Sequence, residues 1–116
     1  MDALISPLIE ALRHAIPMVV RVASDSGDYL EGVFSRGDLP RAEALLRKTL
    51  GPPIKEFGAT ASFERTTQDL VNRVGGIRIE QCPFFQQRQS PPIAYAALWP
   101  WASDTTRITL KVGVIF

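Results

Sequence analysis

The chain has 116 residues, of which 46% are hydrophobic and 22% charged, which is typical of one folded domain and excludes intrinsic disorder. Its formal net charge is +1 and its arginines are scattered along the chain, which argues against a nucleic-acid-binding surface. Apolar runs are too short for a membrane span, the N-terminus has no basic signal-peptide region, and the single cysteine allows no internal disulfide. We therefore expect a cytoplasmic protein with no membrane partner.

The first 34 residues predict a helix followed by a β-hairpin. Apolar residues recur at helical spacing after Ser6, a candidate cap, and Pro17 ends the helix. Asp2 is an alternative, earlier start. Residues 18–23 are rich in β-branched side chains and predict a strand. A turn of Asp, Ser and Gly then leads into a second, weaker strand over residues 29–34.

The clearest helix is predicted between Asp38, as its cap, and Gly51, which stops it. Its apolar residues form one stripe, and its charged residues lie on the opposite face. Glu43 and Arg47 are spaced for an ion pair between successive turns.

The middle of the chain predicts two strands flanking a short helix. In residues 54–64 phenylalanine and alanine alternate with small residues, which favours a strand. Thr66 is a plausible cap for a helix that ends at Gly75-Gly76. Residues 77–81 alternate between apolar and polar and predict a strand, which a loop over residues 83–92 follows.

The C-terminal region predicts a hairpin. Residues 93–98 are apolar on both faces, so this strand should lie inside the sheet and be covered on each side. A turn at Asp104-Thr105 leads into a last strand over residues 107–116. The whole order predicts a single α+β domain over residues 1–116, with a largely antiparallel, twisted sheet of five to six strands and two to three helices packed on one face.

Candidates for catalysis are weak. His14 is the only histidine, and it lacks a nucleophile or carboxylate at motif spacing. Cys82 is either exposed beside Arg78, which would favour its reactive thiolate, or a buried and inert side chain; the second interpretation is favoured. Neither dinucleotide nor phosphate-binding glycine motifs occur. We therefore expect no cofactor, no catalytic residue and no metal site.

The most distinctive feature is Trp99-Pro100-Trp101. Residues two apart on an extended chain project to the same face, so the two indoles could line a ligand pocket or anchor a partner; the alternative is that they close one end of the core. Phe84, Phe85 and Tyr95 lie nearby in sequence and complete the candidate ligand- or partner-binding set. The amide-rich loop after Phe85 is a second candidate, or simply a solvated connection.

These features favour a non-enzymatic module that binds a small apolar or aromatic ligand, or that assembles with itself through the sheet. A two-fold dimer is the simplest assembly, and the apolar C-terminal strand is its only support. Two alternatives remain. One is a small enzyme whose site combines distant residues, such as Cys82 or His14 with Asp104. The other is an interaction subunit, such as an immunity, adaptor or phage-type structural protein, which an exposed strand edge would favour.

Overall fold

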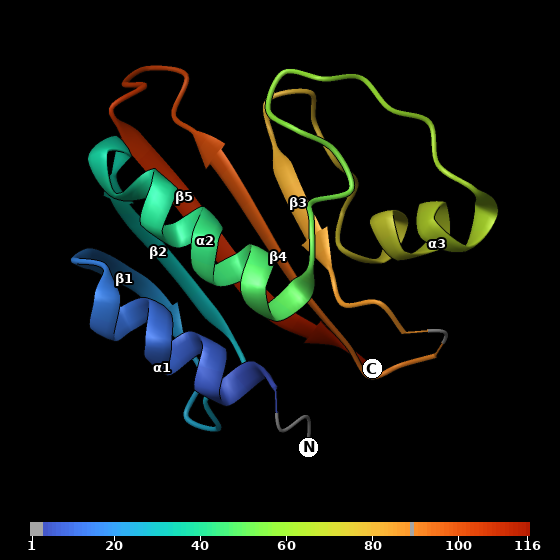
Figure 1. Ribbon diagram of the computed structural model, residues 1–116, viewed down its shortest axis with the longest axis horizontal. Coiled ribbons are helices and arrows are strands. Elements are labelled where there is room, and N and C mark those ends of the chain that lie inside the picture. Colours follow the sequence, from blue (N-terminus) through green and yellow to red (C-terminus); the bar gives the residue numbers. More distant parts are fainter. Residues whose placement is uncertain (1–3, 89) are drawn as a thin grey trace.

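The computed structural model describes residues 4–88 and 90–116, and in these residues it confirms the α+β architecture (Figure 1). Three α-helices accompany five strands, with one turn of 3-10 helix before the second α-helix. In chain order the elements are α1 (Ile5–Ala15), β1 (Met18–Ala23), β2 (Leu30–Ser35), η1 (Arg36–Asp38), α2 (Leu39–Leu50), α3 (Arg65–Arg73), β3 (Cys82–Phe85), β4 (Ile93–Pro100) and β5 (Arg107–Ile115).

The five strands form one antiparallel sheet in the order β1-β2-β5-β4-β3. The two hairpins predicted from sequence are both present, and β4 lies inside the sheet as its apolar composition indicated. The C-terminal strand β5 also lies inside, between β2 and β4. Residues 107–112 of β5 pair with β2, and residues 108–115 pair with β4.

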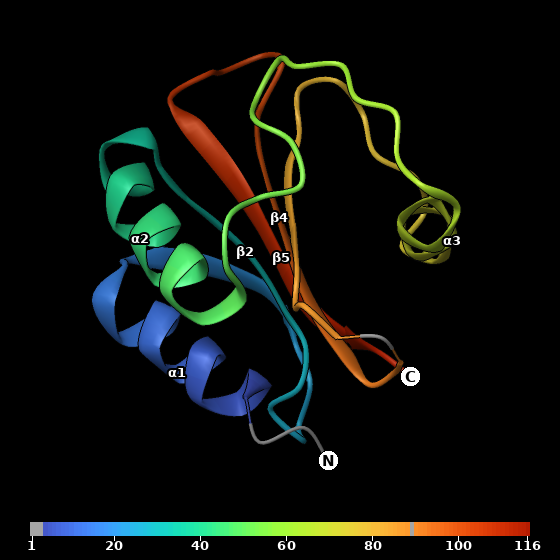
Figure 2. The same cartoon turned by 45° about the vertical axis from the view of Figure 1, so that its right-hand side comes forward.

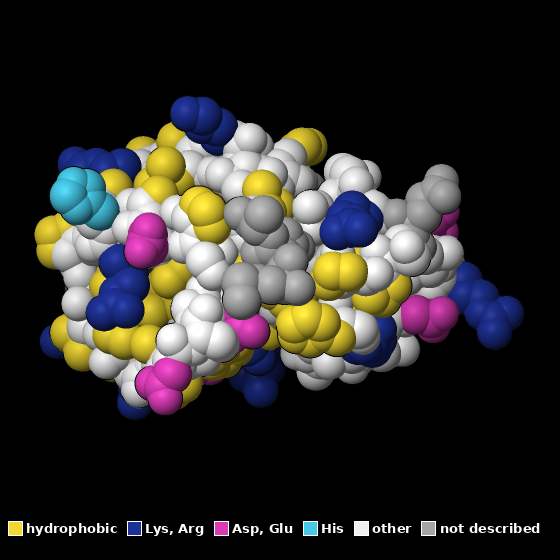
Figure 3. Space-filling model, turned by 90° about the horizontal axis from the view of Figure 1, so that it is seen from below, with side chains coloured by type: hydrophobic (Ala, Val, Ile, Leu, Met, Phe, Trp, Pro, Cys, Tyr) yellow, Lys and Arg dark blue, Asp and Glu magenta, His cyan; other side chains and the backbone are white. Residues whose placement is uncertain are grey.

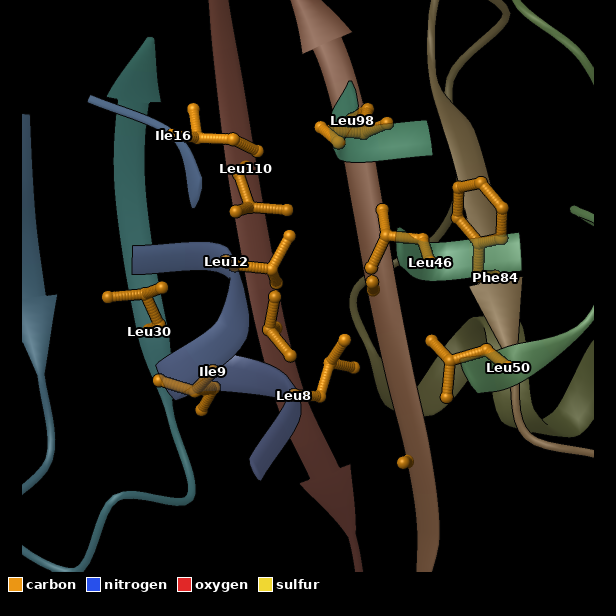
Figure 4. Close-up of a cluster of buried hydrophobic side chains, with 14 of the residues drawn as sticks. Leu8, Ile9, Leu12, Ile16, Leu30, Leu46, Leu50, Phe84, Leu98 and Leu110 are labelled. Carbon is orange, nitrogen blue, oxygen red and sulfur yellow. The ribbon is translucent and has the colours of Figure 1, made fainter. Parts of the chain in front are cut away.

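Helices α1 and α2 cover one face of the sheet and enclose the main core (Figures 1 and 4). Leucines and isoleucines of α1 and leucines of α2 pack against every second residue of the strands, as the helical and strand periodicities require. Leu12, Leu46 and Phe84 are wholly buried there. Burying one such side chain stabilises the fold by roughly 1.5–3 kcal/mol, so this layer supplies most of the hydrophobic stabilisation.

Helix α3 lies on the opposite face, away from α1 and α2 (Figure 2). It covers only the end of the sheet near β3 and β4, where Val71 packs in a smaller cluster with Phe85 and Tyr95. The remainder of this second face, over β1, β2 and the start of β5, has no helix above it among the described residues.

Residues 54–64 are a loop, and the strand predicted there is wrong. Phe57 packs against the main core beneath α2, whereas Phe63 packs against the cluster beneath α3. The two side chains therefore serve opposite faces of the sheet, which a single regular strand with its phenylalanines on one face could not achieve.

The strand predicted over residues 77–81 is also wrong, because pairing starts at Cys82. Residues 77–81 form a turn in which the side chain of Gln81 accepts a hydrogen bond from the backbone N–H of Arg78 (2.9 Å). Ile79 is more than half exposed, so the alternation of residues 77–81 does not mark a buried face. Sequence placed Pro83 in a loop, but it occupies the edge strand β3, where a missing N–H is tolerated.

Two local details differ from the sequence-based expectations. Ser6 lies within α1, where its hydroxyl donates to the carbonyl oxygen of Gly27 (3.0 Å) instead of capping the helix. Arg47 pairs with Glu56 (3.2 Å) across the loop after α2, not with Glu43 one turn earlier. The alternative helix start at Asp2 falls outside the described residues. Among the residues described, no helix is long and apolar enough to cross a membrane.

Candidate functional site: a tryptophan groove on the second sheet face

Trp99 and Trp101 lie together on the face of the sheet opposite α1 and α2. Trp99 is directly opposite Thr109 in the β4–β5 ladder, and their neighbours in sequence, Leu98 and Leu110, point into the main core. Trp101 reaches the same face, because its indole N–H donates to the Thr109 hydroxyl (2.8 Å). The sequence-based expectation that the two indoles share a face therefore agrees with the geometry.

Trp101 is held from both sides. Besides its bond to Thr109, its ring lies beneath the guanidinium of Arg107, 5.3 Å from the ring centroid. Arg107 in turn pairs with Asp104 (3.3 Å) in the β4–β5 turn. A hydroxyl of Thr106 and its backbone N–H both bind the same carboxylate, and the Thr106 side chain is the main reason why the pKa of Asp104 lies below its usual value. The turn thus fixes the orientation of Trp101.

An open groove of about 640 Å³ runs beside the two indoles. Trp99, Pro100 and Trp101 form one wall, and the turn after α3 contributes Arg78 and Glu80. Both tryptophans are half-buried, so each offers part of its ring to solvent. The groove combines an aromatic wall with the polar side chains of Arg78, Glu80, Ser103 and Thr105. The name tryptophan groove is used for it below.

A smaller cavity of about 70 Å³ lies behind Trp99, between the sheet and the segment after α3. Phe85 and Tyr95 line it, with ring centroids 6.4 Å apart. The ring of Tyr95 lies over Gly113, where an added Cβ would come within 2.8 Å of the tyrosine oxygen. Burial raises the pKa of Tyr95. The cavity has room for a few waters or a small apolar group, not for a larger ligand.

Phe84 does not join these aromatic residues. It points to the other side of the sheet, where it is wholly buried in the main core beneath α2 (Figure 4). Phe84 and Phe85 are adjacent on a strand, so their side chains must lie on opposite faces. Of the five candidate residues, Trp99 lines both the groove and the cavity, Trp101 lines the groove, and Phe85 and Tyr95 line the cavity.

The amide-rich loop after Phe85 contributes to the sheet at its start. Gln86 exchanges two hydrogen bonds with Ala94, one through its backbone N–H (2.8 Å) and one through its side-chain oxygen (3.0 Å). Gln86 therefore extends the β3–β4 pairing by one residue. Its side-chain oxygen is already bound to the backbone and is not free for a ligand. Gln87 and Arg88 are exposed, and Gln89 falls outside the described residues.

Sequence reasoning missed the residues that orient Trp101 and the charged residues that line the tryptophan groove. Arg107 and Thr109 were assigned to the last strand, without any link to the tryptophans. One sequence signal could have linked Thr109 to Trp99. The length of the β4–β5 turn fixes the register of the hairpin and therefore which residue lies opposite Trp99. Arg78 and Glu80 could not have been placed, because the turn that carries them was predicted as a strand.

A second polar cluster lies beneath α2, around Cys82. Its Sγ atom and carboxylate oxygens of Glu43 and Glu56 lie within 4.8 Å of one another. Three such donors could hold one divalent cation, a possibility that sequence spacing did not reveal. Glu56 is already paired with Arg47, and burial followed by the two carboxylates raises the pKa of the Cys82 thiol to about 12. The raised pKa opposes formation of the thiolate that a metal requires, and Arg47 competes with a cation for the Glu56 carboxylate.

The same cluster contains a buried lysine. The Lys55 ammonium donates to the carbonyl oxygens of Glu56 (3.0 Å), Ile79 (2.8 Å) and Gln81. Burial lowers the pKa of Lys55, and the three carbonyl oxygens compensate for the water that the ammonium has lost. Its geometry is that of a structural bridge between the loop after α2 and the turn before β3.

The residues considered for an enzyme site do not come together. His14 is exposed near the end of α1, where the single histidine stands on the surface (Figure 3). Cys82 is wholly buried, so it is not the exposed residue beside Arg78 that the first interpretation required. Asp104 is bound to Thr106 and Arg107 in the β4–β5 turn. None of the three lines the tryptophan groove or the cavity behind it. No family model, curated protein or solved structure matches this chain.

Proposed function

We propose that the protein is a non-catalytic recognition module that binds a small apolar or aromatic ligand in the tryptophan groove. The observation that carries this proposal is the pair of half-buried indoles, Trp99 and Trp101, side by side along an open groove of about 640 Å³. Small-ligand sites have volumes of about 300–1,000 Å³, so the groove has the right size for such a molecule.

The two indoles have different roles in this proposal. Trp101 is already oriented by Thr109 and Arg107, so a ligand that stacks on it loses little free energy in ordering the side chain. Among the described residues no acceptor binds the indole N–H of Trp99, which leaves this donor for a ligand oxygen. Arg78 and Glu80 at the rim would select for a ligand that carries a polar group beside its apolar body.

A titration followed by nuclear magnetic resonance tests the proposal. The chain has two tryptophans, so its nitrogen–proton spectrum contains two indole signals, assigned with the variants Trp99→Phe and Trp101→Phe. Indole and 8-anilinonaphthalene-1-sulfonate serve as probes. We expect the Trp99 signal to shift most, and each tryptophan-to-alanine change to weaken binding at least about tenfold, or about 1.4 kcal/mol.

Phe116→Ala is the matched control. Phe116 is an exposed aromatic residue outside the groove, so this variant should bind both probes as the unaltered protein does. Millimolar concentrations of either probe that leave both indole signals unmoved would contradict the proposal. Undiminished binding by the two tryptophan-to-alanine variants would contradict it as well.

A further inference from the structure

Strand β1 presents a free edge. Among the described residues it is the terminal strand of the sheet and pairs only with β2, and it is exposed at every residue after Met18. Val19 and Val22 are 69% and 47% exposed, and Arg21, at the bulge, is its only charged residue. Natural edge strands are usually protected by charges, proline, a covering segment or a β-bulge. Strand β1 has a bulge between Val20 and Val22, but its one charge and its exposed valines leave an apolar edge that favours the addition of another strand.

The opposite edge of the sheet is covered. The backbone N–H of Ile54, in the loop after α2, donates to the carbonyl oxygen of Pro83 on β3 (2.9 Å). Pro83 has no N–H to offer in return. Among the described residues the sheet therefore has one free edge and one that is already occupied. Strand β1 of one molecule could not add to β3 of another without displacing Ile54.

From this asymmetry we propose that two copies of the chain associate through their β1 strands, antiparallel about a two-fold axis, so that their sheets become continuous. Pairing β1 with β1 uses the free edge of each copy, and the assembly closes as a dimer instead of growing into a fibre. This inference is independent of ligand binding in the tryptophan groove.

The side chains of β1 are complementary under this symmetry. Val19 and Val22 lie on the same sheet face, because their partners on β2, Val33 and Glu31, are two residues apart. An open groove of about 490 Å³, lined by Met18, Val19 and Val33 among others, runs beside the start of β1 on that side. An antiparallel partner strand brings its own Val22 to this groove, and the two-fold axis repeats the contact. The register that opposes Val19 to Val22 also keeps the two Arg21 charges from facing each other directly.

Strand β1 lies at the outer edge of the sheet and helix α1 flanks it (Figure 1), so the contact need not be limited to the strand.

Sedimentation equilibrium of the unaltered chain and of Val19→Lys, Val22→Lys and the double variant tests the dimer. Both valines are exposed, so these changes should leave circular dichroism and thermal unfolding of the monomer intact. We expect the unaltered chain to sediment at twice 12.8 kDa, and each single change to raise the dimer dissociation constant at least about tenfold. Ile79→Lys, which alters an exposed apolar residue far from β1 in sequence, should leave it unchanged.

Hydrogen exchange gives a second measurement that does not require a variant. The outward amides of β1 should exchange more slowly as the protein concentration is raised, while those of the β1–β2 turn should not change. A chain that stays monomeric at several hundred micromolar overturns the proposal. A dimer whose dissociation constant is unchanged in the double variant also overturns it. The same holds if the exchange rates of all β1 amides are independent of protein concentration.

Discussion

Cys82 shows how burial determines the chemistry of a single residue. Its side chain is wholly enclosed between the sheet and α2, and burial raises its pKa to about 12. Reactivity requires the thiolate, so the folded protein should not react with a thiol reagent. An interpretation from sequence alone had to weigh Arg78 as a neighbour that would activate the thiol. In the structure Arg78 lies in the turn before β3, at the rim of the tryptophan groove.

The shifted pKa of Cys82 predicts a loss of stability in alkali. Below about pH 9, the ordinary pKa of the thiol, both the folded and the unfolded chain keep the proton. Between about pH 9 and the folded pKa of about 12, only the unfolded chain ionises, which favours unfolding. The free energy of unfolding should therefore fall more steeply above pH 9 in the unaltered chain than in Cys82→Ala, measured by urea denaturation at each pH.

At pH 8 Ellman's reagent should label Cys82 only after urea is added. Fast, stoichiometric labelling of the native protein would show that the thiol is accessible and would contradict its placement in the core. Equal alkaline slopes for the two proteins would contradict the raised pKa.

At the scale of the elements, Lys55 connects two segments that lack regular structure. Its ammonium binds backbone carbonyls on both sides, in the loop after α2 and in the turn before β3. We predict that Lys55→Met, which keeps the apolar stem and removes the charge, lowers the free energy of unfolding by about 1–3 kcal/mol, because the carbonyl oxygens lose their donor in a buried place. Urea denaturation measures this difference.

Lys48→Met is the matched control for Lys55. Lys48 is exposed on α2, and changes at such surface positions usually alter stability by less than about 0.5 kcal/mol. Equal effects of the two lysine changes would show that the Lys55 bridge adds nothing to stability.

The same two segments mark the limit of what the sequence could predict. Helices α1, α2 and α3 and the hairpins β1–β2 and β4–β5 follow from local periodicity and turn residues, which neighbouring residues supply. Residues 54–64 and 77–81 alternate as strands do, yet a buried lysine and packing against two different clusters determine their course. Such contacts join residues distant in sequence, and a single sequence does not reveal them.

The candidate site also has a part that local sequence predicts and a part that depends on tertiary structure. The shared face of Trp99 and Trp101 follows from strand alternation alone, and the structure agrees with it. The separation of Phe84 from Phe85 follows from the same rule, but only once β3 is recognised as a strand. The rim residues Arg78 and Glu80 reach the groove through tertiary structure, so no local pattern could have assigned them.

At the scale of the whole molecule, the two faces of the sheet are unequally protected. The core beneath α1 and α2 contains most of the wholly buried side chains. The cluster beneath α3 is smaller, and Val71 is the one fully enclosed residue that the described helix contributes to it. Segments with few buried apolar contacts open locally at a lower free-energy cost than the global unfolding of a domain.

We therefore predict that α3 opens before the rest of the fold. In native-state hydrogen exchange the amides of α3 should show a lower opening free energy than those of β5 in the sheet centre. Leu46→Ala should reduce the global free energy of unfolding by about 2–5 kcal/mol and accelerate exchange everywhere. Val71→Ala should act chiefly on α3 and the residues beside it. If the amides of α3 and β5 exchange with one common free energy in the unaltered chain, the two faces unfold as a single unit and the prediction is wrong.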